Sequence, residues 1–134
     1  MAEKSLLAFI GGAFLYSENH DALANWYSKM LGIIWEKTPD GSAYYQSYYY
    51  NEIDSGKKAY VGLSIIHSKK KIARDEGKSH MINYRVSDLA RLVELLRSNG
   101  LEVKGIDKYP EGDFAWCKDP DGNEMELWED TTLK

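Results

Sequence analysis

The stretch DPDGNEMELWE, residues 119–129, joins a tight turn to a strand-like pattern. The Asp-Pro-Asp-Gly run is typical of a turn, and the residues that follow alternate between polar and apolar side chains. Successive side chains of a strand point to opposite faces, so one face carries Glu124, Glu126 and Trp128. The other face carries Met125 and Leu127 and is expected to pack into a core. The first face is either a solvated surface or the wall of a pocket.

The segments upstream of this strand predict a unit of one helix and four strands. Ser87 or Asp88 is suited to cap a helix over 88–99, and Gly100 ends it. Leucine and valine recur at spacings of three and four along that helix, which predicts one apolar face. Strands are expected over the segments HMINYRVS, LEVKGID, FAWCKD and NEMELWE, which are residues 80–87, 101–107, 114–119 and 123–129.

The first half of the chain repeats this order. Asn19 is suited to cap a helix over 20–31, and Gly32 ends it. Strands are expected over the segments LLAFIGGAFLYS, IIWEKT, SAYYQSYYYNEI and AYVGLSIIHS, which are residues 6–17, 33–38, 42–53 and 59–68. The apolar positions of the two helices correspond at an offset of 66 residues, as in Leu23 and Leu89 or Tyr27 and Val93. Such a repeat indicates two copies of one structural unit.

One helix covers only one face of its sheet, so each unit must meet the other unit or a ligand. The predicted fold is therefore α+β, with two tandem βαβββ modules that form an incompletely closed, curved mixed β-barrel with a central cavity. The 134 residues are predicted to form a single domain. Its first module spans about 5–67, a linker about 68–78, and its second module about 79–130.

Composition and charge exclude several classes of function. The net charge of −4 does not favour nucleic acid, and Asp75 and Glu76 follow the short basic run at 69–71. No apolar stretch approaches the roughly 20 residues that span a bilayer, and the first residues lack the pattern of a signal peptide. Cys117 is the only cysteine, which is consistent with a cytoplasmic protein. Its thiol is expected to be buried rather than catalytic.

Three motifs carry a resemblance to a known family. They are ALANWYSKMLGI at residues 22–33, NYRVSDL at 83–89 with its helix ending in LRSNGLEV, and DPDGNEMELWE at 119–129. Together with the repeat, they make the chain resemble the vicinal oxygen chelate superfamily, which includes glyoxalase I, bleomycin-resistance proteins and extradiol dioxygenases. The resemblance covers nearly the whole chain. It implies a small-molecule ligand and a homodimer.

Metal-dependent members of this family place one ligand on each of four strands that face the cavity. Carried over by position, the first falls on Gly12, the third on Met81 and the fourth on Glu126, while no typical ligand lies within the strand that supplies the second. The resemblance thus implies a divergent member without most metal ligands, and no cofactor is predicted. The alternative is zinc, nickel or iron held by Glu126, His80 and possibly His67, which requires a bulge that turns His80 inward.

Without a metal, Glu126 is a candidate acid or base, or a hydrogen-bond acceptor for a ligand; it is otherwise an exposed or ion-paired carboxylate. Strand alternation suggests further cavity-lining residues, each of which could equally belong to the core or the surface. Arg85 is a candidate to neutralise Glu126 or to bind an anionic group. The candidate ligand-binding residues are Phe14, Tyr16, Asn83, Arg85, Trp116 and Trp128.

Three functions remain open at this level. The first is a glyoxalase-like or bleomycin-resistance-like protein that binds a small oxygenated or planar aromatic molecule in an aromatic-lined cavity, without a metal. The second is a metal-dependent lyase, isomerase or dioxygenase with an atypical ligand set. The third is a partner-binding or regulatory module that uses the tyrosine-rich run at residues 44–50 as an interface.

Overall fold

A computed structural model describes residues 12–53, 55–69 and 81–132. Its elements in chain order are β1 (Gly12–Ser17), α1 (His20–Leu31), β2 (Glu36–Lys37), β3 (Ala43–Asn51), β4 (Lys58–His67), β5 (Ile82–Arg85), α2 (Leu89–Ser98), β6 (Lys104–Tyr109), β7 (Gly112–Lys118) and β8 (Glu124–Glu129). The chain is therefore α+β with two βαβββ modules, as predicted.

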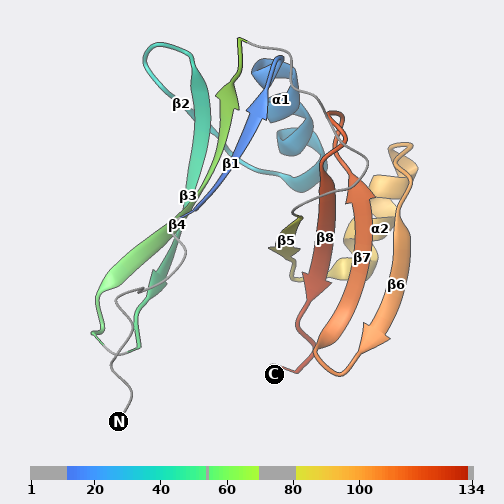
Figure 1. The fold of residues 1–134 in the computed structure, drawn as a ribbon. Helices are drawn as coiled ribbons and strands as arrows, with labels where there is room; N and C mark the ends of the chain where they lie inside the picture. Colours follow the sequence, from blue (N-terminus) through green and yellow to red (C-terminus); the bar gives the residue numbers. More distant parts are fainter. Residues whose placement is uncertain (1–11, 54, 70–80, 133–134) are drawn as a thin grey trace.

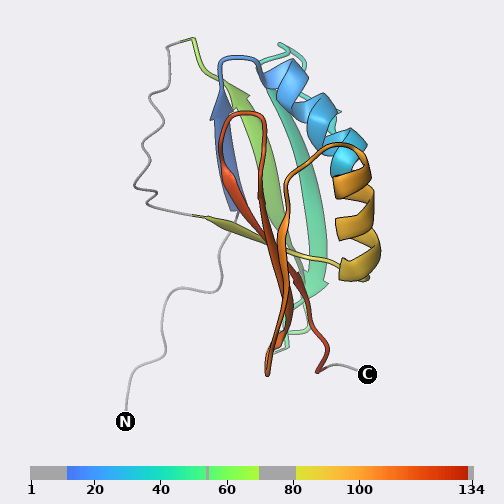
Figure 2. The same ribbon diagram turned by 90° about the vertical axis from the view of Figure 1, so that its right-hand side faces the viewer.

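Each module contains one mixed four-stranded sheet. The strand order is β1-β4-β3-β2 in the first sheet and β5-β8-β7-β6 in the second, so the two sheets have the same topology. In each sheet the first strand runs parallel to the last, and the other pairings are antiparallel. The two sheets do not close into a barrel, and both helices lie on the same side of them (Figure 1, Figure 2).

The helices begin and end where the sequence predicts. The Asn19 side chain accepts a hydrogen bond from the backbone N–H of Ala22, and Gly32 ends α1 with a φ of 71°. Asp88, rather than Ser87, caps α2, and its carboxylate accepts a hydrogen bond from the N–H of Arg91. A left-handed residue after a helix is favourable for glycine because glycine has no Cβ.

One hydrophobic cluster contains residues from both modules. In each module the helix covers one face of the sheet, and the strand residues below it are almost completely buried. Met125 and Leu127 belong to this cluster, so the prediction from their alternation with Glu124 and Glu126 is confirmed. The buried residues with the largest side chains are Tyr27, Leu23, Ile65, Leu89, Leu96, Met125 and Leu127.

Tyr27 on α1 connects the first module to the second. Its hydroxyl donates a hydrogen bond of 2.8 Å to Asp119 at the end of β7, and its ring lies 6.3 Å from that of Tyr84 on β5. Burial raises the pKa of Tyr27 far above its usual range, with nearby Tyr84 and Asp119 adding to the effect. Tyr27 therefore remains a neutral hydrogen-bond donor at the junction of the modules.

One predicted strand is much shorter than expected. The segment 33–38 was expected to be a strand, but only Glu36 and Lys37 pair with β3. The residues before them bond to α1 instead: Ser28 donates its hydroxyl to the carbonyl of Ile33, and the Trp35 indole donates to the carbonyl of Ala24. Packing against the helix thus replaces strand pairing there. No helix among the described residues is long and apolar enough to cross a membrane.

Candidate functional site

The helix-free face of the second sheet brings most of the predicted site residues together. Helix α2 covers the other face, where Ala115 and Leu127 are fully buried. The strand register places Glu126 on β8 between Asn83 on β5 and Trp116 on β7. The next row of the same face is Arg85, Trp128 and Phe114. This six-residue surface is called the second-sheet face below.

Glu126 is held by two neutral donors on this face. The Asn83 side-chain amide donates to Glu126 Oε2 at 2.8 Å, and the Trp116 indole donates to Glu126 Oε1 at 3.1 Å. These bonds fix the orientation of the half-buried carboxylate. A carboxylate offers about four acceptor positions, so Glu126 can still accept hydrogen bonds from a ligand.

Three aromatic rings stand nearly parallel beside this carboxylate. The Phe114 ring lies 6.3 Å from that of Trp116 with an interplanar angle of 13°, and 6.4 Å from that of Trp128 with an angle of 20°. The Trp128 indole is fixed by a 3.0 Å bond to the carbonyl of Glu111. Sequence reasoning missed Phe114, although its alternation with Trp116 along one strand is the signal that could have found it.

Arg85 contacts an aromatic ring and not the glutamate that was suggested as its partner. Its guanidinium lies 5.8 Å from the centre of the Trp128 ring, a cation–π contact. The two residues face each other on β5 and β8, whereas Glu126 faces Asn83. The suggested neutralisation of Glu126 by Arg85 is therefore not what the structure shows. Arg85 instead places a positive charge at the edge of the aromatic row.

Phe14 and Tyr16 lie on the first sheet, on its helix-free face. Both are exposed, at 61% and 53%, while their neighbour Leu15 is buried beneath α1. The register places Phe14 beside Ser64, and Ser64 beside Tyr45. These aromatic residues thus form a separate open surface, and the predicted site residues are divided between two sheets.

A cleft of about 1200 Å³ lies between the modules. Tyr48 and Val61 from the first sheet line one wall, and Tyr84, Val86 and Leu92 line the other. Asn83 and Arg85 reach its rim, but Glu126, Trp116 and Trp128 do not line it. Burial, the largest of several causes, raises the pKa of Tyr84 to about 12, and its buried hydroxyl has no hydrogen-bond partner among the described residues.

The residues at the family's ligand positions do not fit a metal centre. A Cβ at Gly12 would lie 2.4 Å from the carbonyl oxygen of Gly62, so a metal-binding side chain does not fit there. Met81 is exposed and offers only a thioether. Catalytic zinc usually has three protein ligands, and the described part of the chain has no group of three His, Cys, Asp or Glu side chains that could hold a metal. His80 lies outside the described residues.

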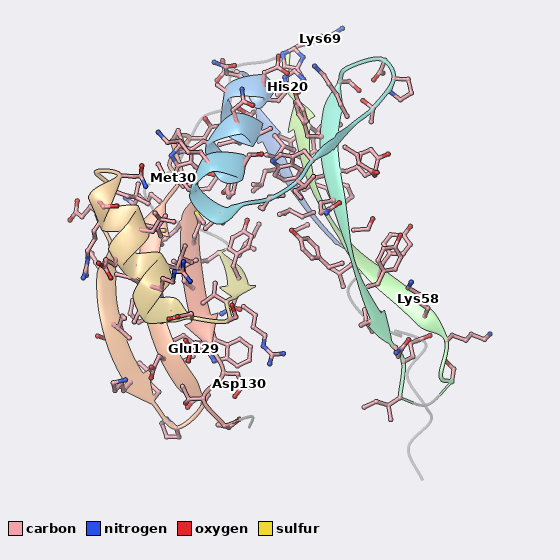
Figure 3. All side chains as sticks on the ribbon, turned by 180° about the vertical axis from the view of Figure 1, so that it is seen from behind. His20, Met30, Lys58, Lys69, Glu129 and Asp130 are labelled. Carbon is pink, nitrogen blue, oxygen red and sulfur yellow. The ribbon has the colours of Figure 1, made fainter. Side chains whose placement is uncertain are left out.

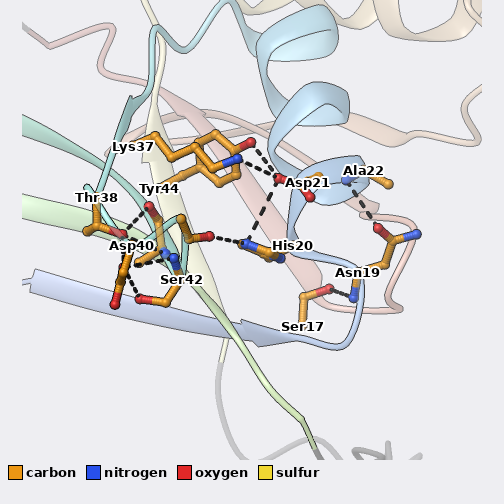
Figure 4. A network of polar contacts seen from close by, with 12 residues as sticks. Ser17, Asn19, His20, Asp21, Ala22, Lys37, Thr38, Asp40, Ser42 and Tyr44 are labelled. Carbon is orange, nitrogen blue, oxygen red and sulfur yellow. Dashed lines mark hydrogen bonds and ion pairs between the residues drawn. The ribbon is translucent and has the colours of Figure 1, made fainter.

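His67, the third residue of the alternative metal set, packs against another histidine. Its ring stacks on that of His20 at 4.7 Å, and His20 Nε2 donates to the carbonyl of Gly41 at 2.7 Å. Beside them, Asp21 accepts hydrogen bonds from Tyr44 and Lys37 (Figure 4). These contacts connect the start of α1 to the first sheet, which is a structural role.

Comparison with solved structures supports the fold. The chain resembles a glyoxalase family protein from Bacillus anthracis with a TM-score of 0.70 and 13% sequence identity, and the match covers 96% of this chain and 100% of the other. The chain also resembles TnmS3, an antibiotic-binding protein from Streptomyces sp. CB03234, with a TM-score of 0.62 and 16% sequence identity. That match covers 96% of this chain and 100% of TnmS3. The match to lactoylglutathione lyase from Agrobacterium tumefaciens has a TM-score of 0.61 and 16% sequence identity, and it covers 93% of this chain and 96% of the lyase.

No curated protein sequence matches the chain. At these identities the structural neighbours show a shared fold and not a shared activity. The sequence profile of the Glyoxalase/Bleomycin resistance protein/Dioxygenase superfamily matches residues 9–127, which is most of the chain. The chain therefore belongs to the Glyoxalase/Bleomycin resistance protein/Dioxygenase superfamily.

Proposed function

We propose that the protein binds a planar aromatic or small oxygenated molecule on the second-sheet face, without a metal. The observation that carries this proposal is the pair of donors that fix Glu126 beside the three near-parallel rings of Phe114, Trp116 and Trp128. Flat rings provide a stacking surface, and the oriented carboxylate provides a polar contact. Small-molecule sites commonly combine apolar walls with a few placed polar groups.

Each residue of the face has a role in this proposal. Phe114, Trp116 and Trp128 stack on the ligand, and Asn83 holds the carboxylate in place. Glu126 accepts a hydrogen bond from an N–H or O–H group of the ligand, and it is the residue in reach if a proton is transferred. The antibiotic-binding neighbour TnmS3 is consistent with a binding role for this fold.

Two fluorescent probes test the proposal. Acridine is planar and lacks a hydrogen-bond donor, whereas 9-acridone adds an N–H group. We expect Trp116→Ala to weaken the binding of both probes by about tenfold, because loss of one stacking ring removes about 1–3 kcal/mol in base stacking on aromatic side chains. Glu126→Gln is expected to weaken only the binding of 9-acridone. Fluorescence titration measures both affinities.

Leu95→Ala is the matched control, since Leu95 is an exposed apolar residue on α2, which covers the opposite face of the same sheet. It is expected to leave both affinities unchanged. Equal affinity of wild type and Trp116→Ala for acridine would overturn the proposed stacking site. Stoichiometric metal in the purified protein that disappears in Glu126→Ala would overturn its metal-free character.

A further inference from the structure

Arg85 carries the positive charge of the second-sheet face. It is exposed at the end of β5, and its guanidinium lies 5.8 Å from the centre of the Trp128 ring. A guanidinium has five N–H donors in a planar fork, and no described residue accepts a hydrogen bond from them or forms an ion pair with Arg85. These donors therefore remain open to a molecule that is bound beside the aromatic rings.

The acidic residues that lie nearest to the end of this sheet bond to backbone groups and not to Arg85. Figure 3 shows Glu129 and Asp130 at the end of β8. Glu129 accepts a hydrogen bond of 2.7 Å from the N–H of Leu89, and Asp130 accepts one of 2.9 Å from the N–H of Thr132. Neither carboxylate pairs with the guanidinium.

Two further acids share the sheet with Arg85. Asp107 pairs with Phe114 on the edge strand at the far side of the sheet. Adjacent strands are about 4.8 Å apart, so three strand spacings place Asp107 about 14 Å from Arg85, beyond the screening length of about 8 Å at physiological salt. Glu126 is a diagonal neighbour of Arg85 on the adjacent strand, at about 8 Å. The face therefore has an oriented acceptor and a set of unused cationic donors about 8 Å apart.

A ligand that contacts both groups needs a hydrogen-bond donor at one end and an anion at the other. An aromatic carboxylate meets this requirement, because a planar carboxylate accepts two parallel hydrogen bonds from a guanidinium. Its charge is repelled at the Glu126 end, where two like charges would meet. Attraction at Arg85 and repulsion at Glu126 thus favour one orientation of the ligand.

We infer that the second-sheet face selects an aromatic carboxylate, and that Arg85 is the residue that binds its carboxylate group. The aromatic part of the ligand stacks on the rings of the face, and its N–H or O–H group donates to Glu126. The inference rests on the proposed function and adds the charge and the orientation of the ligand. Arg85 is then a specificity-determining residue of this site.

Three derivatives of 9-acridone test the inference by fluorescence titration at neutral pH. The 2-carboxylate carries its charge para to the ring N–H, the 2-carboxamide is its neutral counterpart of similar shape, and the 4-carboxylate places the charge next to the N–H. We expect wild type to bind the 2-carboxylate at least about tenfold more tightly than the 2-carboxamide, because hydrogen bonds to charged groups are worth at least this factor. The 4-carboxylate should bind no better than the 2-carboxamide, since its charge meets Glu126.

Substitutions of arginine separate Arg85 from the net charge of the chain. Arg85→Gln should reduce the preference for the 2-carboxylate over the 2-carboxamide to less than about twofold, because it removes the charge and the fork. Arg85→Lys keeps the charge without the fork and should give an intermediate preference. Arg91→Gln is the matched control, since Arg91 is an exposed arginine on α2, which covers the opposite face of the sheet. It should keep the wild-type preference.

Two results would overturn the inference and leave the proposed function intact. One is equal wild-type affinity for the 2-carboxylate and the 2-carboxamide, and the other is a preference that persists in Arg85→Gln. In both cases acridine would still bind more weakly to Trp116→Ala than to wild type. Equal affinity of wild type and Trp116→Ala for acridine would instead overturn the stacking site and the inference with it.

Discussion

Tyr27 and Tyr84 are neighbouring buried tyrosines whose hydroxyl groups differ in their bonding. Tyr27 donates to Asp119, whereas the Tyr84 hydroxyl has no hydrogen-bond partner in the part of the chain that the structure describes. We expect Tyr27→Phe to lower the free energy of unfolding by about 1–3 kcal/mol, because it leaves a buried carboxyl oxygen short of a donor. Tyr84→Phe is the matched control: it removes a hydroxyl that forms no hydrogen bond within residues 12–53, 55–69 and 81–132, and it should change the free energy of unfolding by less than about 0.5 kcal/mol.

Urea denaturation of the two variants and wild type measures these differences. Equal destabilisation by both substitutions would contradict the role assigned to the Tyr27–Asp119 bond. At this scale the sequence predicts which face Glu126 occupies, because the face follows from alternation along one strand. It does not predict that Asn83 and Trp116 hold the carboxylate, because those contacts depend on the register between three strands that are distant in sequence.

Helix α2 receives a second cap from a strand. Besides Asp88, the Glu129 carboxylate at the end of β8 accepts a 2.7 Å hydrogen bond from the N–H of Leu89. The first N–H groups of a helix lack partners within the helix, and a nearby negative charge is also favourable there. We expect Glu129→Ala to lower the free energy of unfolding by about 0.5–2 kcal/mol, the usual range for loss of a cap.

Glu94→Ala is the control for this prediction, because Glu94 is an exposed glutamate within the same helix. Its effect in urea denaturation should stay within about 0.5 kcal/mol. If Glu129→Ala lowered the free energy of unfolding by as little as Glu94→Ala, Glu129 would not act as a cap of α2. The second cap could not be predicted from the sequence, where it is 40 residues from the helix start. The helix bounds could be predicted, because Asn19, Asp88 and Gly32 act locally.

The arrangement of the modules is the part of the fold that the sequence left open. The repeat predicts two similar sheets in an incompletely closed, curved barrel around a central cavity. The structure has the two sheets and does not close them into a barrel, and Phe14 and Tyr16 lie on one sheet and Glu126 on the other. The reason is that contacts between modules, such as the bond from Tyr27 to Asp119, join residues distant in sequence and have no local sequence signal.

The merged core predicts that the two modules unfold together, as expected for the single domain proposed over residues 1–134. Cys117 of the second module is 5% exposed, and burial, with a smaller effect of Asp119, raises the pKa of its thiol to about 11. The thiolate is the reactive form, so at pH 8 Cys117 should react with iodoacetamide only after unfolding. In a Trp116→Phe/Trp128→Phe variant, tryptophan fluorescence comes only from Trp26 and Trp35 of the first module.

The urea midpoint from this fluorescence should equal the midpoint from Cys117 alkylation in the same variant, since coincident transitions by different probes indicate cooperative unfolding. The two modules share one hydrophobic cluster, so neither module can unfold without exposing core residues of the other. The Tyr27–Asp119 hydrogen bond is likewise lost when either module unfolds. Alkylation complete at a urea concentration where the fluorescence is still native would show that the second module unfolds alone. The repeat would then correspond to two independent domains.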